Sequence, residues 1–257
     1  PNQIPLELGQ GLAALVVVST AAWALAFTAV YRELHPRLAA SRWIFDTIPA
    51  GTVLTAEAWD DALPISASIH THASRYTILT LPVTDEDTPA KVDVLVDALD
   101  RAEYVVLSSG RNADMLPRLP ARFPVMVRYY DALRDGRLGF DLVREFSVTP
   151  RLGRVALDDA TAEEAFTVYD HPHVRIYRKH ARWSARAARA LLSDVDWLGI
   201  VRTSAVQASR APGLLALSEA RREALDVEGS WRSGPHARFA SPRHGAAAVA
   251  AWMLMVL

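Results

Sequence analysis

The chain has 257 residues, a formal net charge of −1 and no cysteine. The near-neutral charge gives no basis for a nucleic-acid partner, and the lack of cysteine excludes disulfide bonds, cysteine-based zinc sites and thiol catalysis. With 51% hydrophobic residues, the length suffices for one large core or two small ones.

After a short loop over residues 1–10, the run Gly11–Tyr31 contains no charged residue. A bilayer core of about 30 Å needs roughly 20 helical residues, so this run predicts a transmembrane helix over residues 11–31. A buried core helix of a soluble protein is the alternative. A cleaved signal peptide is disfavoured, because a basic leading region is missing and the run exceeds the ~15 apolar residues usual for such peptides.

The other end of the sequence is also apolar. Residues 245–257 read "GAAAVAAWMLMVL", which is too short to span a bilayer and resembles the first half of a second span. Because the sequence starts at Pro1 and stops inside this run, we expect a fragment of a multi-pass protein of the cell membrane.

Residues 35–180 have the pattern of a soluble domain. Short β-branched runs alternate with amphipathic stretches, which predicts an α/β fold, a Rossmann-like layer with a mostly parallel sheet. The predicted helices cover residues 36–48, 90–102 and 124–136, the last closed by Gly136, and the predicted strands cover residues 51–59, 75–84, 103–109, 140–148 and 173–179.

Residues 181–244 are rich in alanine and arginine and predict an amphipathic helical linker. Helices with a basic face, such as "RWSARAARALL", often lie in the headgroup region when a membrane is near. An ordinary solvated linker explains the pattern equally well.

Candidate binding residues follow two of the predicted strands. Trp59, Asp60 and Asp61 lie at the carboxyl end of the first strand, and Ser109 and Arg111 lie at that of the third. In parallel sheets, ligands favour the loops beyond the carboxyl ends of the strands. The two carboxylates suit a polar turn, or binding of sugar hydroxyls or a cation; a catalytic dyad is disfavoured, because adjacent side chains on an extended chain point opposite ways. Trp59 suits either a core position or stacking on a sugar ring.

Aromatic and polar residues later in the chain give further candidates. Tyr130 lies on a predicted helix beside an arginine and a second tyrosine, and could contact phosphate or sugar. The more frequent arrangement packs one such tyrosine inward and leaves the other at the surface. Tyr169, Asp170 and His171 precede a proline, where they suit either a binding role or a simple turn.

No motif for a nucleotide or a metal is complete. The stretch "SSGRN" holds one glycine and lacks a phosphate-binding fingerprint. His70 and His72 would share a face of an extended chain, which gives half a metal site or an ordinary loop. We therefore expect no cofactor and no metal in this segment.

Four stretches together carry a family resemblance. They are "HPRLAASRWIFDTIPAGTVLTAEAWDDALP", "YVVLSSGR", "LPARFPVMVRYYDALRDGRLGFDLVREF" and "AEEAFTVYDHPHVRIYRK". They resemble the soluble region that follows the transmembrane part of family 39 (protein mannosyltransferase-like) glycosyltransferases. In some of these a second hydrophobic half of the DUF2298, or YYY membrane protein, type follows, and the Ala-rich tail is similar to the approach to it.

The resemblance implies an enzyme of the GT-C fold that transfers a sugar from a lipid-phosphate donor to a glycan or protein acceptor, beside the lipid bilayer. The catalytic acid of that family lies in an early loop, and no residue here matches it. We therefore expect an accessory soluble domain whose parent holds the catalytic residues, and a divalent cation in the parent is left open. The alternative is a non-catalytic interaction or sensing domain of an integral membrane protein.

The side of the membrane is argued in two directions. Arg32, Arg37 and Arg42 follow the first predicted span, and the positive-inside rule would place them in the cytoplasm. The family resemblance implies an extracytoplasmic domain. Since long domains translocate largely regardless of charge, we expect the extracytoplasmic side.

Overall fold

The computed structural model describes residues 6–65, 75–160 and 162–202. The chain divides into two compact units, which are described separately. The larger comprises Glu33–Thr149 and Asp159–Ala216, and the smaller comprises Pro1–Arg32, Pro150–Asp158 and Leu217–Leu257. The predicted second span, and the predicted linker beyond residue 202, lie outside the described residues.

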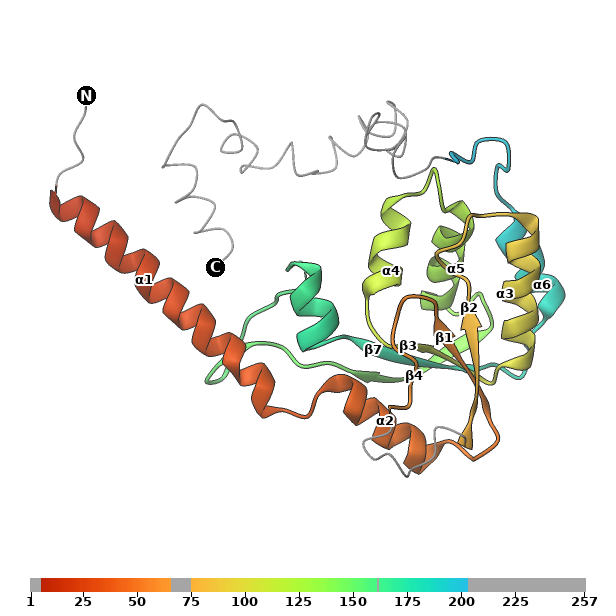
Figure 1. The fold of residues 1–257 in the computed structure, drawn as a ribbon, viewed down its shortest axis with the longest axis horizontal. Helices are drawn as coiled ribbons and strands as arrows, with labels where there is room; N and C mark the ends of the chain where they lie inside the picture. The colour runs from red at the N-terminus through yellow and green to blue at the C-terminus, as the bar shows by residue number, and fades with distance from the viewer. Residues whose placement is uncertain (1–5, 66–74, 161, 203–257) are drawn as a thin grey trace. The chain divides into compact units, whose positions relative to one another are not determined.

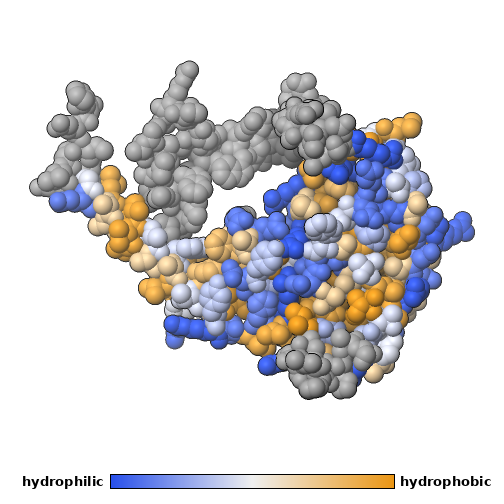
Figure 2. All heavy atoms as spheres, viewed as in Figure 1, coloured by the Kyte–Doolittle hydropathy of each residue, from blue (hydrophilic) through white to orange (hydrophobic). Residues whose placement is uncertain are grey.

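One long apolar helix dominates the smaller unit. Helix α1 (Leu6–Thr28) continues into a 3-10 turn, η1 (Ala29–Arg32), and within the described ranges it is the helix long and apolar enough to cross a bilayer. Its apolar side chains are largely exposed (Figure 2), Val17 and Val18 at 66% each. This exposure suits a helix that faces lipid. A short hairpin of β5 (Arg151–Leu152) and β6 (Val155–Ala156) completes the described part of this unit.

A five-stranded sheet forms the centre of the larger unit (Figure 1), with the strand order β2-β1-β3-β7-β4. The strands are β1 (Val53–Glu57), β2 (Thr77–Leu81), β3 (Tyr104–Leu107), β4 (Phe140–Phe146) and β7 (Val174–Lys179). All five coincide with predicted strands, and the α/β class is confirmed.

The sheet is mixed, which corrects the expectation of a mostly parallel one. Strand β1 pairs in parallel with β2 and β3, but β7 pairs antiparallel with both β3 and β4. The physical reason is the connection from β4 to β7. Phe146 at the end of β4 pairs with Val174 at the start of β7, so β7 enters the sheet at the end where β4 leaves, and the two strands run in opposite directions.

Strand β3 is buried on both faces, as its apolar sequence predicts. Tyr104 and Val106 join the core beneath α2 (Pro36–Thr47), while Val105 and Leu107 join the core of the opposite face. That opposite face is covered by α3 (Pro89–Arg101), α5 (Pro124–Arg134) and α6 (Ala185–Ser193), as Figure 1 shows. The two-residue period of the strand therefore divides its side chains between two hydrophobic cores.

The start of α3 is fixed by a local cap and a buried ion pair. Thr88 Oγ1 accepts a hydrogen bond from Lys91 N at 3.1 Å, and Pro89 occupies the first helical position. Lys91 Nζ donates to Asp87 Oδ1 at 2.8 Å, and the other oxygen of Asp87 accepts from Val125 N at 2.7 Å. Because both charged side chains are buried, the pair ties α3 to the beginning of α5 inside the core.

Strand β4 forms one edge of the sheet. Its register against β7 shifts between Leu142 and Arg144, which marks a bulge. Residues 141–145 are exposed along this edge.

Candidate functional site

Two loops meet beyond the carboxyl ends of β1 and β3. Ser109 Oγ donates to Asp60 Oδ2 at 2.5 Å, and Arg111 Nη1 donates to the backbone oxygen of Trp59 at 2.6 Å. The sequence predicted that these four residues lie at the ends of strands, and the structure brings them together. With Arg37 and Tyr169 they form what we call the strand-end cluster.

Asp60 has its hydrogen-bonding capacity filled by the protein itself. Its side chain is 2% exposed and accepts from Arg37 Nη2 at 3.0 Å, from Ser109 Oγ and from the backbone nitrogen of Asp61 at 2.9 Å. The contact with Asp61 N is the one that a polar turn predicts. Asp60 therefore holds the two loops together.

Asp61 contacts the same guanidinium as Asp60, so the two side chains do not point opposite ways as the alternation of an extended chain predicts. Its side chain is 63% exposed and lies 2.9 Å from Arg37 Nη1. The two carboxylates thus bind different nitrogens of one guanidinium group and do not pair with each other, an arrangement unlike a catalytic dyad that shares a proton.

Arg37 was missed among the candidate residues. It lies at the start of α2, where His35 Nδ1 accepts from Arg37 N at 3.2 Å, and its guanidinium is buried. Arg37, Ser41 and Ile44 follow helical spacing and are all buried, so the arginine lies in the inward-facing stripe of α2. A charged residue in such a stripe needs a buried partner, and this signal could have identified Arg37 as the counterpart of an aspartate.

Arg111 connects the cluster to residues 162–171. Its Nε donates to Glu164 Oε1 at 3.1 Å, its Nη2 donates to the Tyr169 hydroxyl, and its guanidinium carbon lies 4.9 Å from the centre of the Tyr169 ring. Tyr169 lies in a π-helix, η4 (Ala165–Asp170), and its backbone oxygen accepts from His35 Nε2 at 3.0 Å. π-helical turns are frequent at functional sites, and this one delivers an exposed tyrosine to the cluster.

The neighbours of Tyr169 behave differently. His171 is buried and lies 2.8 Å from Asp159 Oδ2, so this contact forms away from Arg111. Asp170 ends the π-helix and is half-buried. Of the three predicted residues in this stretch, the structure joins Tyr169 to the cluster.

Trp59 is the most exposed member of the cluster, at 79%. The interpretation as a core tryptophan is therefore wrong. Its backbone has φ 69°, in the left-handed region that non-glycine residues avoid. A large aromatic residue kept exposed at a strained position is typical of a site selected for contact with a ligand.

A second group of polar side chains lies buried behind the cluster, on the α5 side of β1. Glu57 accepts from the Tyr130 hydroxyl at 2.9 Å and from Asn112 Nδ2 at 3.2 Å. Burial raises the pKa of Glu57 to about 7, and burial together with Glu57 raises the pKa of Tyr130 well above its ordinary value. Tyr129 is buried as well, so the expected division into one inward and one outward tyrosine is wrong.

Some polar atoms in and beside this buried group form no hydrogen bond with the described residues. Within the described part of the chain, Asn112 Oδ1 and the Tyr129 hydroxyl have no hydrogen-bond partner. Because Tyr130 bonds to Glu57 in the core, it is not available to a ligand at the surface. Its predicted role in contacting sugar or phosphate directly does not fit this position.

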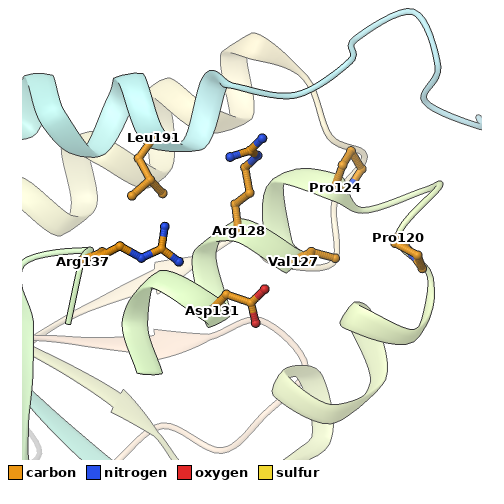
Figure 3. A pocket seen from close by; sticks show the side chains of 7 residues that line it. All are labelled: Pro120, Pro124, Val127, Arg128, Asp131, Arg137 and Leu191. Carbon is orange, nitrogen blue, oxygen red and sulfur yellow. The ribbon is translucent and has the colours of Figure 1, made fainter. Parts of the chain in front are cut away.

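A groove of about 360 Å³ lies elsewhere on the larger unit, beside α5 and α6, and Figure 3 shows the side chains that line it. It is lined by Pro120, Pro124, Val127, Arg128, Asp131, Arg137 and Leu191. Arg128 Nη2 lies 2.9 Å from Asp194 Oδ2, and Arg137 Nε lies 2.7 Å from Asp135 Oδ2. Surface carboxylates therefore offset both arginines, and the groove shares no residue with the strand-end cluster.

No metal centre is found in the part of the chain that the structure describes: it holds no group of three or more histidine, aspartate or glutamate residues suited to a metal ion. His70 and His72 lie outside the described residues. Comparison with family models, with curated proteins and with solved structures finds no match to this chain. The assignment of a function therefore depends on the strand-end cluster and on helix α1.

Proposed function

We propose that this chain is the accessory ligand-binding part of a multi-pass membrane glycosyltransferase, and that its strand-end cluster holds a sugar of the donor or acceptor. The observation that carries the proposal is Trp59, an exposed aromatic residue held in a left-handed backbone beside the donors of Arg111. Aromatic rings stack on the apolar faces of sugars, and neighbouring polar groups bind their hydroxyls.

Two further features support this proposal. Helix α1 suits a chain that works at the bilayer, where a lipid-linked donor would lie. The parallel pairing of β1 with β2 and β3 supports the proposal of a Rossmann-like layer, and the cluster follows the carboxyl ends of β1 and β3.

The described carboxylates at the cluster support an accessory role. Asp60 is paired with Arg37 and Ser109, Glu164 with Arg111, and Glu57 with Tyr130. Each of these three carboxylates has a partner within the protein, which supports a role in holding the site together more than a role as a general base. The same observation favours the second candidate function, a non-catalytic interaction or sensing domain of a membrane protein.

Trp59→Gly tests the sugar-binding proposal. Glycine accepts the left-handed backbone without strain, so the variant should be about 0.5–1 kcal/mol more stable than the native chain. We expect it to bind α-mannotriose about fivefold more weakly, since an exposed ring contributes on the order of 1 kcal/mol by stacking. Calorimetric titration of the full chain in nanodiscs measures the affinity, and urea unfolding measures the stability.

Leu198→Gly is the matched control, because Leu198 is a fully exposed apolar residue of the same unit outside the cluster. It should bind α-mannotriose as the native chain does. Equal affinity of Trp59→Gly and the native chain, or no binding by either, would remove the sugar-binding proposal and favour the interaction or sensing domain.

We further propose that the larger unit lies on the extracytoplasmic side. The chain has no native cysteine, so Asp97→Cys on the exposed surface of α3 creates a unique label site. An impermeant maleimide should label this cysteine in intact cells. Labelling only after lysis would place the unit in the cytoplasm, as the arginine flanks suggest.

A further inference from the structure

We propose that Arg111 is an anion-binding residue for a phosphate group, and that the Glu164 carboxylate occupies the place of that group in the present structure. This inference deepens the proposed function and rests on it, because it assigns the charged part of a ligand whose sugar contacts Trp59. The inference depends on two hydrogen-bond donors of Arg111 and on the two side chains that now accept from them.

The guanidinium of Arg111 is anchored on one side and exchangeable on the other. Nη1 donates to the backbone oxygen of Trp59, which fixes the group to the loop after β1. The remaining donors, Nε and Nη2, form the edge that binds two oxygens of a carboxylate or phosphate side by side. Here that edge is divided between Glu164 Oε1 and the Tyr169 hydroxyl.

A guanidinium edge that binds two separate acceptors is held less strongly than one that binds two oxygens of the same anion. A single phosphate offers two oxygens at the spacing of Nε and Nη2, whereas Glu164 supplies one oxygen and Tyr169 supplies a neutral hydroxyl. The Tyr169 hydroxyl can donate its own proton to a phosphate oxygen. A phosphate would therefore replace Glu164 and retain Tyr169 as a neighbour.

Exposure makes Glu164 the partner that can leave. Its side chain is 54% exposed, and that of Arg111 is 21% exposed. Exposed ion pairs are weak, because water solvates the separated carboxylate well. Arg37, by contrast, has a side chain that is 6% exposed and is held by the buried Asp60 as well as by the exposed Asp61, so its guanidinium is less accessible to a phosphate than that of Arg111.

The test uses the full chain in phosphatidylcholine nanodiscs and inorganic phosphate as the probe. Glu164→Gln removes the competing charge, so we expect phosphate to bind roughly two- to fivefold more tightly than to the native chain. Glu163→Gln is the matched control, since it makes the same charge change one residue away and keeps an oxygen for Ala165 N. It should leave the affinity close to native. Arg111→Lys keeps the positive charge but removes the pair of side-by-side donors. Added to the Glu164→Gln variant, it should weaken the binding of phosphate.

Equal affinities of Glu164→Gln and Glu163→Gln would overturn the inference, as would absence of phosphate binding to a folded Glu164→Gln variant. If phosphate binds, competition experiments identify the natural source of the group. Phosphatidic acid in the nanodisc displaces inorganic phosphate if the natural ligand is a lipid headgroup, and α-glucose 1-phosphate displaces it if the natural ligand is soluble. The phosphate experiment and the α-mannotriose experiment can fail independently of each other. Phosphate binding without any effect of Trp59→Gly on α-mannotriose keeps the anion site and rejects the sugar site, and the reverse result does the opposite.

Discussion

Replacing Asp87 with alanine is expected to lower the free energy of unfolding by about 3–5 kcal/mol, because it leaves a buried charge without its partner. The Lys91 ammonium would keep only the backbone oxygens of Val83 and Asp85 as acceptors. Val125 N would lose its acceptor as well. Burial already lowers the pKa of Lys91, which shows that the site disfavours its charge even when Asp87 is present. Urea unfolding of the full chain in detergent, followed by near-ultraviolet circular dichroism, measures the loss.

Two comparison variants separate the ion pair from general effects. Glu86→Ala removes an exposed acid next in sequence and should change stability by less than about 0.5 kcal/mol. Asp87→Ala combined with Lys91→Met removes both charges and should be more stable than Asp87→Ala alone, because no unpaired ammonium remains. If Asp87→Ala behaved like Glu86→Ala, the buried pair would not hold α3 and α5 together.

A second large effect is expected in the pH dependence of stability, through Glu57. Burial raises the pKa of this carboxyl from its ordinary value of 4.5 to about 7 in the folded chain. The folded state therefore binds the proton more tightly than the unfolded state. The contribution of Glu57 to stability is complete below pH 4.5, declines as the pH rises, and is lost above pH 7. Since each pH step between the two values corresponds to about 1.4 kcal/mol, the decline totals about 3 kcal/mol.

Glu57→Gln isolates this contribution from that of all other groups. Glutamine stays neutral, so the variant should gain about 3 kcal/mol relative to the native chain between pH 4.5 and pH 7. Any cost of the altered hydrogen bonds to Tyr130 and Asn112 is independent of pH and shifts the whole curve. Glu86→Gln, at an exposed position, should show a nearly constant difference from the native chain. Parallel curves for Glu57→Gln and the native chain would contradict the raised pKa.

The parts of the fold that depend on local sequence could be predicted. The amphipathic pattern over residues 90–102 predicts α3, and Gly136, with φ 78°, closes the segment after α5 as expected. The direction of β7 could not be predicted, because it depends on where the chain re-enters the sheet. Neither its length nor its apolar pattern records that direction.

The strand-end cluster was predicted in part for the same reason. Trp59, Asp60, Ser109 and Arg111 could be named because strand ends are visible in the sequence. Their partners could not, since Arg37 lies 23 residues from Asp60 and Glu164 lies 53 residues from Arg111. Pairing at such separations is decided by the packing of elements, which a single sequence does not encode in a readable pattern.

The bulge in β4 has a consequence for how copies of the protein meet one another. A regular edge strand presents a row of unpaired amide and carbonyl groups, with which a strand of another molecule can pair. The shift between Leu142 and Arg144 breaks that regular spacing, and the charged side chains of Asp141, Arg144 and Glu145 repel a flat neighbour. The β4 edge of this sheet is therefore a poor template for growth into fibrils.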